Sequence, residues 1–379
     1  MRQRLFVWMF FLTLGFMTPH TCYAAQLYDT FYDQSEIEAM DQDIDEICGK
    51  YQTTQKISFR EILSLLMEGN VDKAVTLSIQ QFYEALFSEI LINKELIIRL
   101  LIIVVIAAIF RNYSSILKMS YVGEQGFYVT YLFIAVLLIQ SFSLVYGIAE
   151  ETIYYINDLM KCMMPAFYLS LMFCSGLTTS HMVNTMFLSM LVFVEEILLK
   201  IILLAIRIYF LITLLNQLNK EDRFSKLAGL LKQGIHFVLK TITTGIIGLN
   251  VVKSMLIPVY ENAKYNVLQK GLSVIPGGST LTGLSSILVG AGMLIKNSVG
   301  ITVVLILIVC SGVPLLKMFA FYVVYKVITA LVQPISDNRI LTGIQGISDS
   351  TGILIRATST SLVLSILSIA IVILTTNVR

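Results

Sequence analysis

Long hydrophobic runs separated by short polar stretches dominate the chain after about residue 90. Several of them reach the roughly 17–25 residues that a helix needs to cross a bilayer. The pattern predicts an all-α, polytopic helical membrane protein with about six to nine crossings. The clearest runs are Ile90–Phe110, Gly126–Ala149, Ile235–Val259, Val299–Leu316, Met318–Val332 and Leu362–Leu374.

One run is short and follows an acidic stretch. Met163–Leu177 contains Pro165, and the residues before it include Glu150 and Glu151. Acidic residues are tolerated on the outer side of the membrane. We therefore expect Gly126–Ala149 to cross outward and the acidic stretch to form an outer loop.

Another apolar run is interrupted by charge. Met182–Leu215 is too long for one simple crossing, and it contains Glu195, Glu196 and Lys200. The run is therefore either one long tilted helix or two half-spans. Glu196 and Lys200 have the order and spacing of a helical ion pair. They are either an interfacial pair at a bend or part of an intramembrane site that relays protons or binds a cation.

The first residues have the features of an export signal. Arg2 and Arg4 precede a short apolar core, and Cys22-Tyr23-Ala24 offers small residues at the two positions that a signal peptidase recognises before cleavage after Ala24. This pattern predicts a cleavable signal peptide over residues 1–24, with an uncleaved anchor as the alternative.

Residues 25–89 form the polar part of the chain, acidic at first and then helical in pattern. Acidic residues do not hinder translocation, so this region is expected to be exported. Gly69 and Asn70 are expected to divide the helical part into two helices. The region is either a small cap on the membrane domain, which covers residues 90–379, or a docking site for an extracytoplasmic partner.

A sequence repeat lies in the last third of the chain. LTGLSSILVGAGMLIKN begins at Leu281 and LTGIQGISDSTGILIRA begins at Leu341, an offset of 341 − 281 = 60 residues. Each copy follows a proline, Pro276 or Pro334, so the repeat segments are 276–299 and 334–359. A break followed by a short, glycine-bearing helix predicts re-entrant or amphipathic repeated helices.

On a helix, each copy of the repeat has one polar stripe. A charge in the middle of a bilayer costs roughly 2.5–3.5 kcal/mol on insertion scales, so this stripe is expected to face a neighbouring helix, water or the interface. The stripe of the second copy is Thr342, Gln345, Asp349, Gly352 and Arg356, and that of the first is Thr282, Ser285, Val289, Gly292 and Lys296.

The direction of the repeat depends on whether its copies cross the membrane. If they do not cross, the two spans between them make the repeat parallel. If each copy crosses, the repeat is inverted, as in many transporters. The polar content of the second copy favours the parallel arrangement.

Composition supports the membrane assignment and narrows the function. Of the 379 residues, 56% are hydrophobic and 14% are charged, and the net charge of +2 gives no support for a nucleic-acid partner. The five cysteines have no disulfide or metal spacing. Motifs of hydrolases and phosphate loops are absent from the sequence, so we expect no enzymatic activity, cofactor or metal.

The chain resembles the stage III sporulation protein AE family of endospore-forming bacteria over most of its length. The order and spacing of three motifs carry the resemblance. They are Pro276-Gly277-Gly278, then Lys296-Asn297-Ser298-Val299-Gly300, then Pro334-Ile335-Ser336-Asp337.

This resemblance implies a location and partners. Such proteins lie in the mother-cell membrane that surrounds the forespore. With other membrane and ring-forming proteins of the same sporulation operon, and a forespore membrane partner, they form a channel-like or secretion-like complex needed for late forespore development. The alternative that we keep open is a secondary transporter that uses its internal repeat.

Overall fold

The structure is a bundle of long helices. The computed structural model describes residues 42–44, 46–47, 59–92, 98, 102, 120–175, 186, 189–190, 192–218, 223–272, 278–333 and 338–375, and these ranges contain no β-strand. The main helices are α4 (Phe59–Met67), α5 (Val71–Ile92), α7 (Ser120–Ser175), the π-helix η1 (Ile197–Leu203), α9 (Leu204–Asn216), α10 (Ser225–Leu272), α11 (Gly278–Val332) and α12 (Asn338–Thr375). The predicted all-α class is confirmed.

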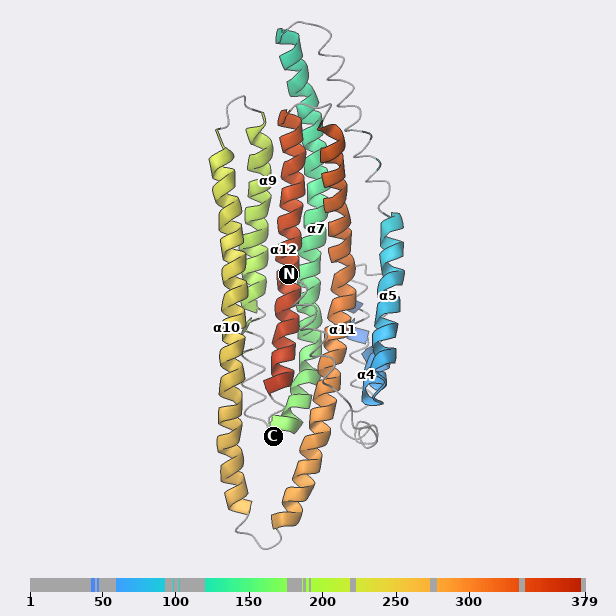
Figure 1. Cartoon of the computed structure of the whole chain (residues 1–379), viewed down its shortest axis with the longest axis vertical. Coiled ribbons are helices and arrows are strands. Elements are labelled where there is room, and N and C mark those ends of the chain that lie inside the picture. Colours follow the sequence, from blue (N-terminus) through green and yellow to red (C-terminus); the bar gives the residue numbers. More distant parts are fainter. Residues whose placement is uncertain are drawn as a thin grey trace.

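Helix α12 occupies the middle of the bundle. It packs against α11 on one side, against α9 and α10 on the other, and against α7 (Figure 1). Its residues Ile344, Ile347 and Leu354 are almost completely buried in the core that these helices share. A second core joins α4 and α5 to the later part of α7, the middle of α11 and the end of α12. Every long helix therefore has one face fixed by apolar packing.

Four of the described helical segments are long and apolar enough to cross a membrane. They are Tyr131–Pro165, Val192–Asn216, Asn297–Leu331 and Asn338–Ala370. These candidate spans agree with the predicted class of a polytopic helical membrane protein. The predicted first span, Ile90–Phe110, lies largely outside the described residues.

Two buried hydroxyl contacts connect helices that lie far apart in the sequence. The Tyr131 hydroxyl of α7 donates to the Leu214 carbonyl of α9 at 2.8 Å. The hydroxyl groups of Ser141 in α7 and Tyr325 in α11 share a hydrogen bond of 2.5 Å. Because a buried polar group is costly without a partner, these contacts fix how α9 and α11 sit against α7.

The predicted break at Gly69 and Asn70 is confirmed. Helix α4 ends at Met67, and Gly69 has a φ of 79°, a conformation that glycine adopts without steric cost. The Asn70 N–H donates to the Leu65 carbonyl, which closes the turn before α5 begins.

The predicted outer loop around Glu150 and Glu151 is wrong. Both residues lie inside α7, which continues without interruption through Pro165 to Ser175. A helix needs only its backbone hydrogen bonds to continue, so charges can lie along one face without ending it. Similarly, Val192–Asn216 is one continuous helix with a π-helical stretch, so half-spans are not found in this part of Met182–Leu215.

The repeated segments are not separate short helices. The first copy forms the beginning of α11, which continues through Pro314 to Val332, and the second forms the beginning of α12. Helices α11 and α12 are joined at one end and lie side by side (Figure 1), so the two copies point in opposite directions. The re-entrant interpretation and the parallel arrangement are therefore both wrong.

Candidate functional site

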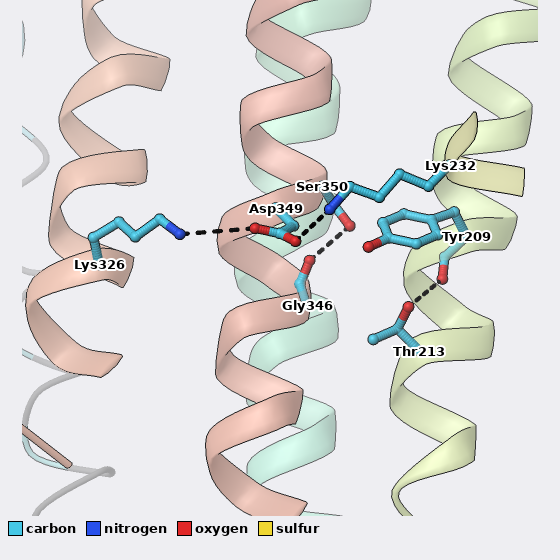
Figure 2. Close-up of polar contacts among 7 residues, drawn as sticks. All are labelled: Tyr209, Thr213, Lys232, Lys326, Gly346, Asp349 and Ser350. Carbon is cyan, nitrogen blue, oxygen red and sulfur yellow. Dashed lines mark hydrogen bonds and ion pairs between the residues drawn. The ribbon is translucent and has the colours of Figure 1, made fainter. Parts of the chain in front are cut away.

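The polar stripe of α12 contains a carboxylate held between two ammonium groups. Asp349 Oδ2 accepts from Lys232 Nζ of α10 at 2.6 Å, and Asp349 Oδ1 lies 3.7 Å from Lys326 Nζ of α11 (Figure 2). About 37% of the Asp349 side chain is exposed. This one carboxylate thus connects the three helices α10, α11 and α12.

Aromatic rings line both ends of this ion-pair chain. The Tyr209 side chain of α9 interacts with Lys232 and lies beside it in the close-up (Figure 2). On the other side, Lys326 Nζ lies 5.6 Å from the centre of the Tyr322 ring. A ring stabilises an ammonium group over its negative face, as Tyr322 does for Lys326, whereas Tyr209 interacts with Lys232 through its hydroxyl group. Each lysine therefore has a second interaction besides its ion pair with Asp349.

Two glycines allow neighbouring helices to approach α12 beside this cluster. A Cβ on Gly346 would lie 2.7 Å from Thr213 Cγ2 of α9, which is closer than atoms can normally pack. A Cβ on Gly352 would lie 3.3 Å from Tyr322 Cε2 of α11. The absence of side chains at these positions lets α9 and α11 come near the α12 backbone.

The rest of the predicted stripe lies on the outer side of α12. Gln345 and Arg356 are exposed, and Gly352 is partly exposed. The Thr342 hydroxyl donates to the Asn338 carbonyl within its own helix. The expected seam is thus present, and Asp349 and Gly352 are the members of the stripe that lie against neighbouring helices in the described part of the chain.

The face that carries Asp349 is cationic. Lys232, Lys326 and Arg356 contribute three positive charges and Asp349 one negative charge, which gives +3 − 1 = +2. His236 of α10 lies within electrostatic range of Arg356 and Lys232. This arrangement could orient an anionic group, or it could hold three helices in register through one carboxylate.

A second polar feature of α12 was not predicted. Its buried face carries a row of small hydroxyl residues, several of them at helical spacings of three and four. Ser348 and Thr351 are fully buried, and their hydroxyl oxygens have no hydrogen-bond partner among the described residues. The spacing could have shown this row in the sequence. Its members are Ser348, Thr351, Thr358, Ser361, Ser365 and Ser368.

The charges of the Val192–Asn216 helix form two ion pairs away from Asp349. Glu195 accepts from Lys161 of α7 at 3.2 Å, and Glu196 lies 2.7 Å from Lys200 in its own helix. The predicted pairing of Glu196 with Lys200 is therefore present. In the described part of the chain, these four charged residues make no ion pair with the α12 stripe.

The remaining predicted residues belong to the start of α11 or to the connections. Gly278 is the first residue of α11, which also contains Gly292 and Lys296. Asn297 is partly buried, and its side-chain oxygen has no hydrogen-bond partner within the described ranges. The structure describes the backbone of Lys296 but not its side chain. Pro276, Gly277, Pro334 and Asp337 also lie outside the described residues.

Sequence reasoning identified Asp349 but not the residues that hold it. Lys232 stands in a basic segment with Lys220, Arg223 and Lys226, while Lys326 and Tyr209 stand in apolar runs. Lys232 is 117 positions away from Asp349 in the sequence. Such a pairing depends on helix packing, so the sequence contains no local signal for it.

Comparison with known proteins identifies the family. The family model for stage III sporulation protein AE matches residues 57–376. A relative of that name from Bacillus subtilis (strain 168) is 23% identical over 345 residues, which cover 88% of this chain and 83% of the relative. No solved structure matches the chain. Because the family model covers most of the sequence, this chain belongs to the stage III sporulation protein AE family.

Proposed function

We propose that this protein is a membrane-embedded subunit of a channel or secretion-like complex in the mother-cell membrane around the forespore. Family membership supports a role in sporulation, and four apolar helices support a place in a membrane. Its partners are the other membrane and ring-forming products of the sporulation operon and a protein of the forespore membrane. The protein supplies the membrane base and needs no catalytic group of its own.

One observation carries this proposal. The α12 stripe places Gln345, Asp349 and Arg356 on an incompletely covered face of a helix that is otherwise fit to span a bilayer. Polar and charged groups at membrane depth are stable beside protein or water and unstable beside lipid tails. The stripe therefore suits a conduit or a contact with another subunit.

The orientation of the bundle agrees with this role. The start of α7, the end of α9, the start of α10, the end of α11 and the start of α12 lie at one end (Figure 1). Arg223 and Lys226 stand at that end, which the positive-inside rule assigns to the cytoplasm. Helix α4, in the region expected to be exported, lies toward the opposite half.

The proposal is tested by removing the polar stripe. In sporulating cells, the triple variant Gln345→Leu, Asp349→Leu and Arg356→Leu should reduce heat-resistant spores by at least about tenfold and reduce co-purification of the operon partners. The matched control is Val323→Leu with Val327→Leu, which alters two exposed apolar residues of α11. Normal spore formation by the triple variant, at normal membrane abundance, would contradict the proposal.

The opposite directions of the two repeat copies favour a second candidate, a secondary transporter. Inverted repeats commonly build such proteins around a site near the membrane midplane. This candidate predicts that vesicles containing the purified protein alone take up solutes from a labelled mixture of amino acids and inorganic ions. Uptake should be lost in Lys296→Ala or Glu196→Gln.

A further inference from the structure

The candidate membrane spans are longer than a bilayer requires. Asn338–Ala370 has 33 residues and Asn297–Leu331 has 35. At 1.5 Å per residue these helices are about 50 Å long, whereas the hydrocarbon core of a bilayer is about 30 Å thick. A usual tilt of about 20° removes only a small part of this difference. Part of each helix must therefore lie outside the hydrocarbon.

Exposed apolar side chains are concentrated in one half of α7 and of α11. On α7, five large apolar residues are exposed within Val129–Ile139, whereas Tyr154 is the only one in residues 140–165. On α11, four are exposed within Phe319–Leu331 and none in residues 297–318, all of which the structure describes. The half of each helix that carries these side chains is the half suited to contact with lipid.

The same surface continues on α9 and α10. The Tyr131 hydroxyl of α7 binds the Leu214 carbonyl of α9, and Thr213 lies against Gly346 of α12. Asp349, one turn further along α12, pairs with lysines of α10 and α11, so these parts of the helices lie at one level. We call this surface the apolar girdle. Its residues are Val129, Leu132, Phe133, Val136 and Ile139 of α7, Leu204, Ile208, Leu211 and Leu215 of α9, Phe224, Leu227, Leu230 and Phe237 at the start of α10, and Phe319, Val323, Val327 and Leu331 of α11.

Polar residues stand at both ends of the apolar girdle. On α12, Arg339 and Arg356 are 356 − 339 = 17 residues apart, and on α11 Lys317 and Gln333 are 333 − 317 = 16 residues apart. At 1.5 Å per residue both separations are about 25 Å, close to the hydrocarbon thickness of about 30 Å. The girdle therefore has the height of one bilayer, although the helices that carry it are longer.

Charged residues follow the girdle on α7 and on the Val192–Asn216 helix. From Glu150 to Lys161 they cover 161 − 150 = 11 residues, or about 16 Å of α7. The side chains of Lys161 and Lys200 are 43% and 70% exposed. Exposed ion pairs are ordinary in water and costly beside lipid tails. We call these residues the charged belt: Glu150, Glu151, Asp158 and Lys161 of α7, and Glu195, Glu196 and Lys200 of the facing helix.

The border between girdle and belt is graded. Arg207 stands in the girdle, but its guanidinium lies 5.7 Å from the centre of the ring of Tyr146, which precedes Glu150 by one turn. Some large apolar side chains are also exposed at or beyond the belt, scattered over four helices, as is normal for a surface in water. They are Tyr154, Val192, Phe193, Ile201, Ile247, Leu249, Val251 and Val363.

Helices α4 and α5 lie beside the half of the bundle beyond the belt (Figure 1). Ile62 of α4 is buried in the core that contains Leu159 of α7 and Ile306 of α11. The other side of α4 is polar, with Arg60 and Glu61 exposed. A helix with one apolar stripe against protein and a polar outer face is typical of a surface in water. The apolar stretch of α11 around Ile306 is thus covered by protein and does not need lipid.

From these observations we infer that lipid surrounds only the apolar girdle, and that the half of the bundle beyond the charged belt projects into the extracytoplasmic space. The end with Arg223 and Lys226 then lies at the cytoplasmic surface. Within the girdle, the face with Gln345 and Asp349 is the exception, because its charges suit water or another subunit. Only a membrane location is required, so the inference stands apart from the proposed channel role.

Spin labels report directly whether a position lies in lipid or in water. Single cysteines replace Phe133 or Leu211 in the girdle and Tyr154 or Val192 beyond it, in a chain whose native cysteines are changed to alanine. All four positions are exposed, at 69%, 37%, 40% and 47%. The purified chain is placed in liposomes, and collisions of each label with oxygen and with a water-soluble nickel chelate are measured. Because oxygen concentrates in lipid and the chelate in water, the ratio of the two collision rates should be about tenfold higher at Phe133 and Leu211.

Two results of this experiment would overturn the inference. One is a lipid-like ratio at Tyr154 and Val192, which would place the whole length of the spans in the bilayer. The other is a water-like ratio at Phe133 and Leu211, which would remove the girdle from lipid. Liposomes that contain this chain alone exclude protection of any position by an operon partner.

Lysine substitutions test the same division in cells, with every native cysteine retained. Phe133→Lys places a charge in the girdle and should reduce the amount of the protein in membranes by about fivefold or more. Tyr154→Lys is the matched control on the same helix, and membrane abundance should stay within about twofold of normal, because a charge in water carries no such cost. Equal losses for the two variants would contradict the inference.

Discussion

Two ion-pair groups in the same bundle are built differently. Asp349 contacts lysines from two other helices, so its carboxylate joins α10, α11 and α12. Glu196 pairs with Lys200 four residues later in its own helix, and both side chains are largely exposed. The first group can fix the positions of helices relative to one another. The second cannot, because both partners move with the same backbone.

This difference separates charges that determine the fold from charges that only lie on its surface. An ion pair that joins two helices loses its favourable interaction when either helix moves. An exposed pair within one helix contributes little to stability. We therefore expect substitutions around α12 to affect folding and substitutions near Lys200 to leave it nearly unchanged. The following predictions start with the largest expected effect on stability.

Gly346→Ala should cause the largest loss of stability, about 2 kcal/mol. The new Cβ would lie 2.7 Å from Thr213 Cγ2, so α9 and α12 would have to move apart. Thermal unfolding of the purified protein in detergent measures the change.

Two further variants make this test specific. Thr213→Ser removes the colliding methyl group and should recover most of the stability lost in Gly346→Ala. Gly234→Ala places a Cβ where nothing lies within 4 Å, so it should leave stability unchanged or raise it by up to about 1 kcal/mol. Equal losses for Gly346→Ala and Gly234→Ala would contradict the close approach of α9 and α12.

Asp349→Asn should have a smaller effect, a loss of about 1 kcal/mol, because the carboxylate is partly exposed. The substitution leaves Lys232 and Lys326 without their shared negative charge. The loss should become smaller in high salt if it is electrostatic. A loss that salt does not change would indicate that packing of the side chain, and not its charge, is responsible.

Glu196→Gln should have the smallest effect, with no measurable change in the unfolding temperature of the purified single chain. Its carboxylate pairs with a lysine of the same helix, and that lysine is largely exposed. A clear fall in unfolding temperature for the isolated chain would show that this pair stabilises the fold and that the comparison with Asp349 is incorrect.

The sequence predicted the helical class and the break at Gly69 because both depend on local properties. Apolar runs of membrane length favour helices, and glycine permits the turn. Helix lengths were not predictable in the same way. Glu150, Glu151 and Pro165 lower the local hydropathy without ending α7. The hydropathy pattern therefore divided this one helix into a span, a loop and a shorter span.

The candidate site shows the same division between local and distant information. The polar stripe through Asp349 follows from helical spacing alone. Its lysine partners come from α10 and α11, and only the packing of the bundle brings them together. The opposite directions of the repeat copies also required the full course of α11, because hydropathy divided that helix at Lys317 into two.

The π-helical stretch Ile197–Leu203 changes how the chain tolerates a change in length. A π-helical turn accommodates one residue more than an α-helical turn. Deleting one residue here would let the stretch close as an ordinary α-helix, with Phe210 and Leu214 still facing the core. The same deletion within α9 would rotate one side of that helix by about 100° relative to the other. The fold should thus tolerate the loss of a single codon within Ile197–Leu203, whereas the same loss a few residues later would disrupt the packing of α9.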